Sequence, residues 1–388
     1  MLWTRRALLQ TAAAPVLPGL APPITKVEAF PAPYPVGGQF KFFNTSQRPS
    51  VLVRITCESG AAGWGQSVPI PTWSYETMES VLTTIQSHLA PVLAGGNPFD
   101  IAGAHRAMNR AISPSFSTGM PIAKAGIDLA LHDLAGKLRG QNMPERWGRQ
   151  SLSSIRLSWT VNPQALPETE RIVNEGLHAG YTNFNVKLGT APRFDLEMCE
   201  IVRRMAPNGF LWGDANGGYD LAQALWVAPK LAGVGMDVLE QPIPANRLSG
   251  YRELKKQGAL PLILDEGVVS AADLIEFIRL DLLDGVAMKP ARTGGLHAAR
   301  RQIEILEDAG LIFLGSGLTD PDVSLAASLQ LYGAYQLKFP AALNGPQFLN
   351  GSFLKQPLLV NRGEIAVPLG PGLGVEVDEQ KIALGKPL

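Results

Sequence analysis

Five ionisable residues recur at nearly even intervals along the middle of the chain: Lys187, Asp214, Glu240, Asp265 and Lys289. Their spacings are 27, 26, 25 and 24 residues, each close to the length of one strand plus one helix, and each residue ends a short apolar run. Charged groups at the ends of consecutive strands of a parallel barrel converge on one mouth, where such barrels carry out their chemistry. Three carboxylates between two lysines therefore predict one divalent metal ion flanked by two bases.

The elements that must position these residues follow from a strict alternation after about residue 152. Apolar runs begin near residues 155, 182, 210, 237, 262, 284, 311 and 340. Amphipathic segments lie between most of them, including residues 168–179, 271–280 and 296–309. Eight strands with interposed helices predict a closed parallel barrel. A dinucleotide-binding fold is the competing α/β interpretation, but no GxGxxG motif follows any strand.

The block before the barrel has a different texture and is interpreted as an α+β cap. Residues 24–30 and 50–58 predict strands, and Gly63-Trp64-Gly65 ends their sheet. Three helices are expected over residues 75–93, 98–111 and 122–138, the first with Ser74 as its candidate cap. The glycine-rich tail after residue 368 is expected to return to this block. There Val375, Val377 and Ile382 would supply another strand and a contact.

Composition excludes several classes of partner. The 388-residue chain carries 34 basic and 34 acidic side chains, and this balance argues against binding to nucleic acid or to an anionic membrane surface. No run approaches the roughly 20 apolar residues of a membrane span. The two cysteines, Cys57 and Cys199, are far apart and predict buried free thiols rather than a disulfide or a zinc site.

The first 23 residues differ in kind from the rest. Arg5-Arg6 and the apolar stretch after them resemble a twin-arginine export signal, with a proline-rich exit near Pro22-Pro23. Such signals direct folded proteins out of the cytoplasm, so a periplasmic or exported location is expected. The alternative is a basic amino terminus on a cytoplasmic protein.

The order of the motifs resembles the enolase superfamily, and within it the muconate lactonizing enzyme subgroup of the mandelate racemase/muconate lactonizing enzyme family. The motifs are Lys187, Asp214-Ala215-Asn216, Glu240-Gln241-Pro242, Asp265-Glu266-Gly267, Lys289-Pro290, Gly294-Gly295-Leu296 and Pro371-Gly372-Leu373-Gly374-Val375. The resemblance implies a modified TIM barrel, (β/α)7β-like, over residues 151–367. It also implies an α+β capping domain over residues 24–150 that residues 368–388 complete.

The resemblance further implies the roles of the site residues. Asp214, Glu240 and Asp265 would hold one Mg²⁺ per subunit, with Mn²⁺ as an alternative, through hard oxygen donors. A small carboxylate substrate bound there would lose its α-proton to give a metal-stabilised enediolate, with Lys187 and Lys289 on opposite faces. Residues expected to support the site are Asn185, Asn216 and Glu266. A homo-oligomer is the expected assembly.

Two features depart from the family pattern or narrow it. Asn185 stands where the family usually carries the first lysine of Lys-x-Lys, whereas the second lysine, usually the base, is kept. No histidine follows the seventh strand, as it would in a mandelate racemase-like enzyme, and His297 is interpreted as structural. The segment Asn344-Gly345-Pro346-Gln347 lacks the acidic residues typical of dipeptide epimerases.

Substrate contacts are expected from the cap and from two barrel strands. Phe40 and Trp73, in loops of the cap, are candidates, as are Ser316 and Asn344 at strand ends. Racemisation or epimerisation, cycloisomerisation and β-elimination all use the same enediolate. An isomerase is favoured over a dehydratase of a sugar acid or hydroxy acid, because nothing indicates a dedicated acid for a departing hydroxyl. An exported, non-catalytic barrel that binds metal and ligand is the alternative of another class.

Overall fold

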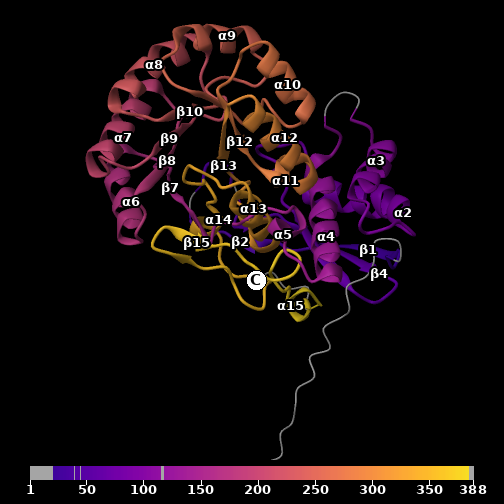
Figure 1. The fold of residues 1–388 in the computed structure, drawn as a ribbon. Coiled ribbons are helices and arrows are strands. Elements are labelled where there is room, and N and C mark those ends of the chain that lie inside the picture. The colour runs from indigo at the N-terminus through magenta and orange to yellow at the C-terminus, as the bar shows by residue number, and fades with distance from the viewer. Residues whose placement is uncertain (1–20, 39, 44, 115–117, 384–388) are drawn as a thin grey trace, which may run out of the picture.

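The computed structural model describes residues 21–383 except 39, 44 and 115–117, and it places a barrel beside a smaller cap (Figure 1). Residues 1–20, which contain most of the predicted export signal, lie outside the described residues, so that signal stays a prediction. Cys57 and Cys199 are both buried free thiols, as expected. Within the described ranges, no helix has the length and apolar character needed to cross a membrane.

In the described part of the chain, the barrel is a parallel sheet of seven strands in sequential order, closed by a short eighth segment. Its strands are β7 (Ser158–Val161), β8 (Asn183–Lys187), β9 (Leu211–Asp214), β10 (Val238–Glu240), β11 (Leu262–Leu264), β12 (Gly285–Met288) and β13 (Ile312–Gly315). Isolated parallel bridges from Leu157 to Ala341 and from Ser316 to Ala342 join the two ends of the sheet. The eight apolar runs of the sequence thus form the expected closed barrel.

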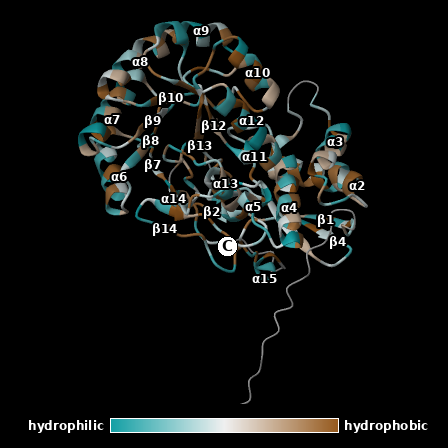
Figure 2. Cartoon of the chain, in the orientation of Figure 1, coloured by the Kyte–Doolittle hydropathy of each residue, from teal (hydrophilic) through white to brown (hydrophobic). Residues whose placement is uncertain are grey.

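Helices surround this sheet, and α6 to α10 form an arc along its outside (Figure 1). The helices are α6 (Leu166–His178), α7 (Pro192–Met205), α8 (Leu221–Val234), α9 (Leu248–Gln257), α10 (Ala271–Arg279), α12 (Leu296–Asp308) and α13 (Asp322–Ala334), with single turns α11 (Pro290–Thr293) and α14 (Gly345–Phe348). The outer helices carry both hydrophilic and hydrophobic residues (Figure 2). In α10, for example, Leu274 and Phe277 are buried while Glu276 is exposed, as one face packs on the barrel.

A layer of apolar side chains fills the barrel interior directly below its mouth. The layer consists of Trp212, Val238, Ile263, Ala287, Leu314 and Ala342. Side chains two residues apart on a strand face the same side. The next inward positions are therefore those of Asp214, Glu240, Asp265, Lys289, Ser316 and Asn344. This two-residue step from a sealed apolar layer to a polar one is what brings the charged residues to a single mouth.

The cap is a three-stranded antiparallel sheet covered by helices. Its elements are β1 (Ile24–Pro31), β4 (Val51–Cys57), β5 (Ala62–Ser67), α1 (Met78–Thr84), the π-helical turn η2 (Ile85–Leu89), α2 (Ala90–Leu93), α3 (Ile101–Ala111), α4 (Pro121–Arg139) and α5 (Met143–Arg146), with the short pair β2 (Tyr34–Pro35) and β3 (Gln47–Arg48). Gly63 and Gly65 lie on β5 against α4, where a Cβ atom on Gly65 would come within 1.9 Å of the Gly126 carbonyl oxygen. Glycine at these positions allows the helix to approach the sheet closely.

The predicted N-cap residue of the first helix in the capping domain is wrong. The first helix begins after Thr77, whose side chain accepts the Ser80 amide in a capping box, and not after Ser74. The neighbouring Glu76 is turned inward instead, because its carboxylate accepts the free amides of Ile122 and Ala123 in the first turn of α4, both at 2.8 Å. Buried carboxylate and helix amides thus satisfy each other.

The tail contacts the cap as predicted but does not form the predicted strand. Leu373 donates its amide to Asp133 of α4 at 2.9 Å, while Val377 makes only an isolated bridge to Leu354. Ile382 lies in a short helix, α15 (Glu379–Ala383). Gly372 and Gly374 adopt φ angles of 71° and 73°, which interrupt an extended strand. A hairpin of β14 (Val360–Asn361) and β15 (Glu364–Ala366) pairs instead with β6 (Ser154–Arg156).

Candidate active site

The structure brings the five predicted ionisable residues together at the carboxyl ends of five consecutive strands. Lys187, Asp214 and Glu240 are in register across β8, β9 and β10. Neighbouring strands lie roughly 4.8 Å apart, so these side chains stand next to one another. Asp265 and Lys289 come directly after β11 and β12. The three acids, here called the carboxylate row, therefore lie between the two lysines.

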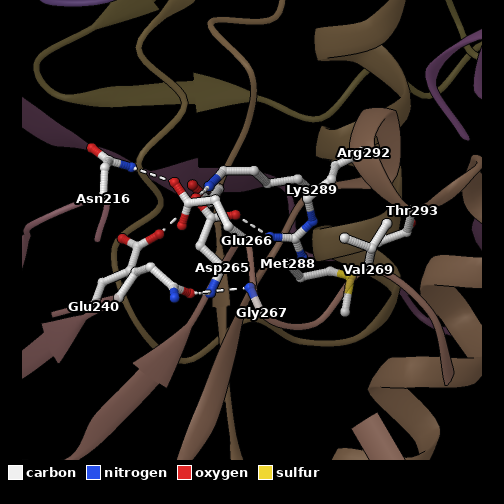
Figure 3. Close-up of polar contacts among 12 residues, drawn as sticks. Asn216, Glu240, Asp265, Glu266, Gly267, Val269, Met288, Lys289, Arg292 and Thr293 are labelled. Carbon is white, nitrogen blue, oxygen red and sulfur yellow. Dashed lines mark hydrogen bonds and ion pairs between the residues drawn. The ribbon is translucent and has the colours of Figure 1, made fainter. Parts of the chain in front are cut away.

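Each lysine is paired with the carboxylate row. The Lys187 Nζ donates to Asp214 Oδ2 at 2.5 Å. The Lys289 side chain extends to Asp265, which it contacts, and to Glu240 Oε1 at 3.5 Å (Figure 3). Among the described residues, no set of three acids, histidines or cysteines is already arranged around a metal position. The lysines occupy carboxylate oxygens that a metal ion would otherwise use.

The electrostatics show which carboxylate is least compensated. Burial and the charge of Asp214 raise the pKa of Glu240 well above its usual range. Burial also opposes the ionisation of Asp214, but Lys187 holds the pKa of that carboxyl below its usual value. For Lys289, Asp265 and Glu240 outweigh the effect of burial and raise its pKa. The row thus accommodates more positive charge than two ammonium groups supply.

Arg292, which the sequence analysis did not single out, contacts the row from a third direction. Its guanidinium is 2% exposed and donates to Asp265 Oδ1, opposite the oxygen that Lys289 takes (Figure 3). Its Nε and Nη2 atoms have no partner within the described residues. A signal was available in the sequence, because Arg292 follows Lys289 by three residues across the turn α11, a spacing that places side chains on one face.

Polar residues behind the row hold its members in place. Asn216, at a φ of 46°, donates its amide to Asp214 Oδ1 at 3.0 Å and its side-chain Nδ2 to Glu266 Oε1 at 3.0 Å. Gln241, a second residue that the sequence analysis did not assign a role, accepts the Asp265 amide at 2.9 Å. These contacts place Asn216 and Glu266 where supporting residues were predicted.

Asn185 lies one layer deeper than the other predicted site residues. It precedes Lys187 by two residues and is at the level of the apolar layer, fully buried beside Trp212. Its Nδ2 is 3.5 Å from the Trp212 carbonyl oxygen, and its Oδ1 has no partner in the described part of the chain. The strand end therefore presents one cation, Lys187, to the mouth.

Two cap loops close over the mouth and place an aromatic ring against each lysine. The Lys187 Nζ is 5.8 Å from the centre of the Phe40 ring, and the Lys289 Nζ is 5.6 Å from the centre of the Trp73 ring. Trp73 also donates its Nε1–H to Glu266 Oε1 at 2.5 Å, while Phe40 stacks on Phe348 at 4.7 Å. Both loops are therefore attached to the barrel rim as well as to the lysines.

All four predicted substrate-contact residues line the cavity at this mouth, namely Phe40, Trp73, Ser316 and Asn344. Asn344 is buried, and its Oδ1 has no partner among the described residues. The cavity has a volume of about 30 Å³. Ligand pockets are typically ~300–1,000 Å³, so the cap loops must move apart to admit a substrate.

His297 lies outside this cavity, at the contact between cap and barrel. Its backbone amide points to Asp128 of α4, and its ring stacks on His105 at 4.8 Å. Burial and the neighbouring His105 lower the pKa of His297 to about 4. This position matches the structural role expected for it.

Fold and site together define a protein of the barrel type, with carboxylates and lysines at the mouth beneath a capping domain. Residues 168–381 match the family described as enolase C-terminal domain-like, and residues 27–146 match the mandelate racemase/muconate lactonizing enzyme N-terminal domain. The chain belongs to the mandelate racemase/muconate lactonizing enzyme family of the enolase superfamily.

Individual relatives are similar along nearly their whole length. A chloromuconate cycloisomerase of Cupriavidus necator is 30% identical over 354 residues, which cover 89% of this chain and 93% of the relative. Muconate cycloisomerase 1 of Rhodococcus opacus is 28% identical, with 92% and 96% covered. The solved muconate lactonizing enzyme from Pseudomonas fluorescens, complexed with muconolactone, has a TM-score of 0.87 at 26% identity, with 94% of this chain and 99% of that chain covered.

These findings confirm the expected superfamily, subgroup and fold, including the TIM-barrel-like domain and its cap. They also confirm that this is an enzyme family whose relatives are isomerases. The roles assigned to individual site residues stay predictions.

Proposed function

We propose that this protein is a Mg²⁺-dependent cycloisomerase that converts an unsaturated dicarboxylate of the muconate type to a lactone. The observation that carries the proposal is the pair of lysines, Lys187 and Lys289, which line one cavity from opposite ends of the carboxylate row. The cycloisomerases similar along nearly the whole chain support the substrate class.

The step requires only that one proton be moved at a defined carbon. A carboxylate oxygen of the diene adds to the far double bond and forms the C–O bond of the lactone. The electron pair of that double bond passes to the neighbouring carbon, which is α to the second carboxylate. The ammonium group of one lysine delivers a proton to this carbon and is reprotonated from solvent, while the other lysine offsets negative charge.

The donor set of the carboxylate row fits a magnesium ion. Asp214, Glu240 and Asp265 offer hard carboxylate oxygens from three neighbouring strands, and Glu240 has only the longer contact of 3.5 Å with Lys289 among the described residues. An ion held there would stabilise the enediolate charge that develops on the substrate carboxylate. Lys187 and Lys289 would release their carboxylate oxygens to the ion and turn toward the substrate.

Epimerisation of an α-substituted carboxylate is the second candidate, because the same two lysines face one cavity. One lysine would remove the α-proton and the other would return it on the opposite face. Dehydration is less well supported, since the described residues of the cavity wall include no further acid positioned for a leaving hydroxyl.

The test is turnover of cis,cis-muconate by purified protein with Mg²⁺, followed by loss of the diene absorbance, with α-hydrogen exchange in D₂O for a panel of other carboxylates. We expect activity that a chelator abolishes. Lys187→Met and Lys289→Met should each reduce it by about 10²–10⁴-fold. Lys230→Met is a matched control, because Lys230 lies over Trp226 on the outer helix α8. Activity that survives chelation contradicts the metal role, and a protein that neither turns over nor exchanges any acid is a binding barrel.

A further inference from the structure

Lys41 is a cation at the edge of the active site that forms no ion pair with any acid among the described residues. It follows Phe40 in the cap loop over the Lys187 end of the mouth. Its Nζ lies 3.5 Å from the carbonyl oxygen of Leu188, the residue directly after Lys187. This ammonium group has no ion-pair partner among the described residues, and it lies beside a cavity that is expected to bind acids. It can therefore bind an anionic ligand.

The loop that carries Lys41 is held by the barrel on one side and by the cap loop of Trp73 on the other. Gly37 donates its amide to the Phe348 carbonyl oxygen at 2.7 Å, and Thr72 donates its hydroxyl to the Phe42 carbonyl oxygen at 2.7 Å. The Phe40 and Phe42 rings pack edge to face, 5.5 Å apart. Lys187 faces the first ring at 5.8 Å and Lys41 faces the second at 5.1 Å. Each of the two ammonium groups thus lies over one ring of this aromatic pair.

A hollow of about 620 Å³ lies next to Phe40 and Lys41. Phe40 lines both this hollow and the cavity at the mouth of the barrel. Lys41 is the single ionisable residue among the described residues that line the hollow. Movement of Phe40 would join the two spaces. An acid that enters by this route meets Lys41 first and Lys187 next.

Charge inside the mouth is distributed unevenly. At the Lys289 end Arg292 adds a permanent positive charge, whereas at the Lys187 end the inward position below is the neutral Asn185. Desolvation lowers the pKa of Lys41, Asp214 partly offsets this effect and Lys187 adds to it, so the charges of all three groups interact. Additional positive charge at this end comes from the cap loop and not from the strand.

We infer that Lys41 binds the substrate carboxylate remote from the carboxylate row, which is the carboxylate whose oxygen adds to the double bond, and so selects dicarboxylates over monocarboxylates. This inference rests on the proposed function and specifies which acids that function accepts. Lys41 is a specificity-determining residue, because it contacts neither the α-carbon nor the metal position. Lys187 and Lys289 remain the groups that move the proton.

The test compares two ligands that differ by one carboxylate. In the presence of Mg²⁺, cis,cis-muconate and 2,4-hexadienoate, the six-carbon diene with a single carboxylate, are titrated into wild-type protein and Lys41→Met by calorimetry. Wild-type protein should bind muconate about 10- to 100-fold more tightly, the range expected for one hydrogen bond to a charged group. Lys41→Met should lose this preference, whereas Lys41→Arg should retain most of it.

Two controls and three possible outcomes separate this inference from its alternatives. Lys230→Met is the matched control, since it removes an exposed lysine that also faces an aromatic ring, and its preference should equal that of wild-type protein. Mg²⁺ affinity should be the same in all variants. If Lys41→Met keeps the wild-type preference for muconate over 2,4-hexadienoate, the inference is wrong. If the wild-type protein binds neither acid, both the inference and the proposed function are wrong. Binding of muconate without turnover contradicts the proposed function alone.

Discussion

At one end of the carboxylate row Lys289 is enclosed by Asp265, Glu240 and the nearby Arg292, whereas at the other end Lys187 pairs with Asp214 alone and lies beneath a cap loop. The first end consists of buried charges that fix one another. The second end is incomplete until the loop is in place. A site with one rigid end and one end formed by the cap can keep the carboxylate row in place while the loop moves.

The two cap loops that cover the mouth, those of Trp73 and Phe40, differ in the same way. At the Lys289 end, Trp73 donates a hydrogen bond to Glu266, so the loop is held by a directional contact with a buried acid. At the Lys187 end, Phe40 is held by stacking on Phe348. Ring stacking is less dependent on orientation than a hydrogen bond, and it tolerates sliding. We therefore expect the Phe40 ring to move aside before the Trp73 ring does, while the hydrogen bonds of Gly37 and Thr72 hold the backbone of the Phe40 loop.

The largest difference between the two ends should appear in the stability of the metal-free protein. Lys289→Met leaves Glu240 and one Asp265 oxygen buried without their partner, which typically costs about 3–5 kcal/mol, whereas Lys187→Met affects one carboxylate. Urea unfolding in EDTA measures both changes. Added Mg²⁺ should narrow the gap, because the ion replaces the missing charge. Equal losses in EDTA would show that the two ends are energetically alike.

The sequence was sufficient to predict the five charged residues because each one interrupts an apolar run at a strand end. Period-two alternation then places Ser316 and Asn344 in the same layer as Asp265 and Lys289. Local patterns of this kind depend only on the strand that carries them. The same logic predicted the closed barrel from eight apolar runs.

Arg292 and Lys41 could not be assigned in this way, because their roles depend on tertiary contacts. Arg292 contacts Asp265 from the turn after a neighbouring strand, and Lys41 reaches the mouth only because the cap docks there. The N-cap residue of the first helix was predicted wrongly for a related reason. The Glu76 carboxylate accepts hydrogen bonds from two backbone amides of α4, which lie some 45 residues further along the chain.

A double-mutant cycle tests whether charges at the Lys289 end act as a unit. Lys289 and Arg292 bind the two oxygens of Asp265, so either one can partly compensate for loss of the other. Combining Lys289→Met with Arg292→Met should destabilise the metal-free protein by more than the sum of the single changes, with a coupling of about 0.5–3 kcal/mol. The matched cycle of Lys187→Met with Arg292→Met should be additive within about 0.5 kcal/mol. Coupling in both cycles would mean that the whole row behaves as one network.

The smallest expected effect concerns the two lids, and it compares changes that conserve the ring. Trp73→Phe keeps an aromatic face over Lys289 but removes the hydrogen bond to Glu266, worth about 0.5–1.5 kcal/mol, so KM should rise about 2- to 10-fold with kcat nearly unchanged. Phe40→Tyr keeps the stacking contact that holds the other loop, so its KM should remain at the wild-type value. Trp226→Phe on α8 is the control for loss of an indole away from the site. Steady-state kinetics on the same substrate decide the outcome. If Trp73→Phe leaves KM unchanged, the bond to Glu266 does not hold the lid. If Phe40→Tyr raises KM as much as Trp73→Phe does, the two lids are held with equal specificity and the contrast between the ends is confined to the charges below them.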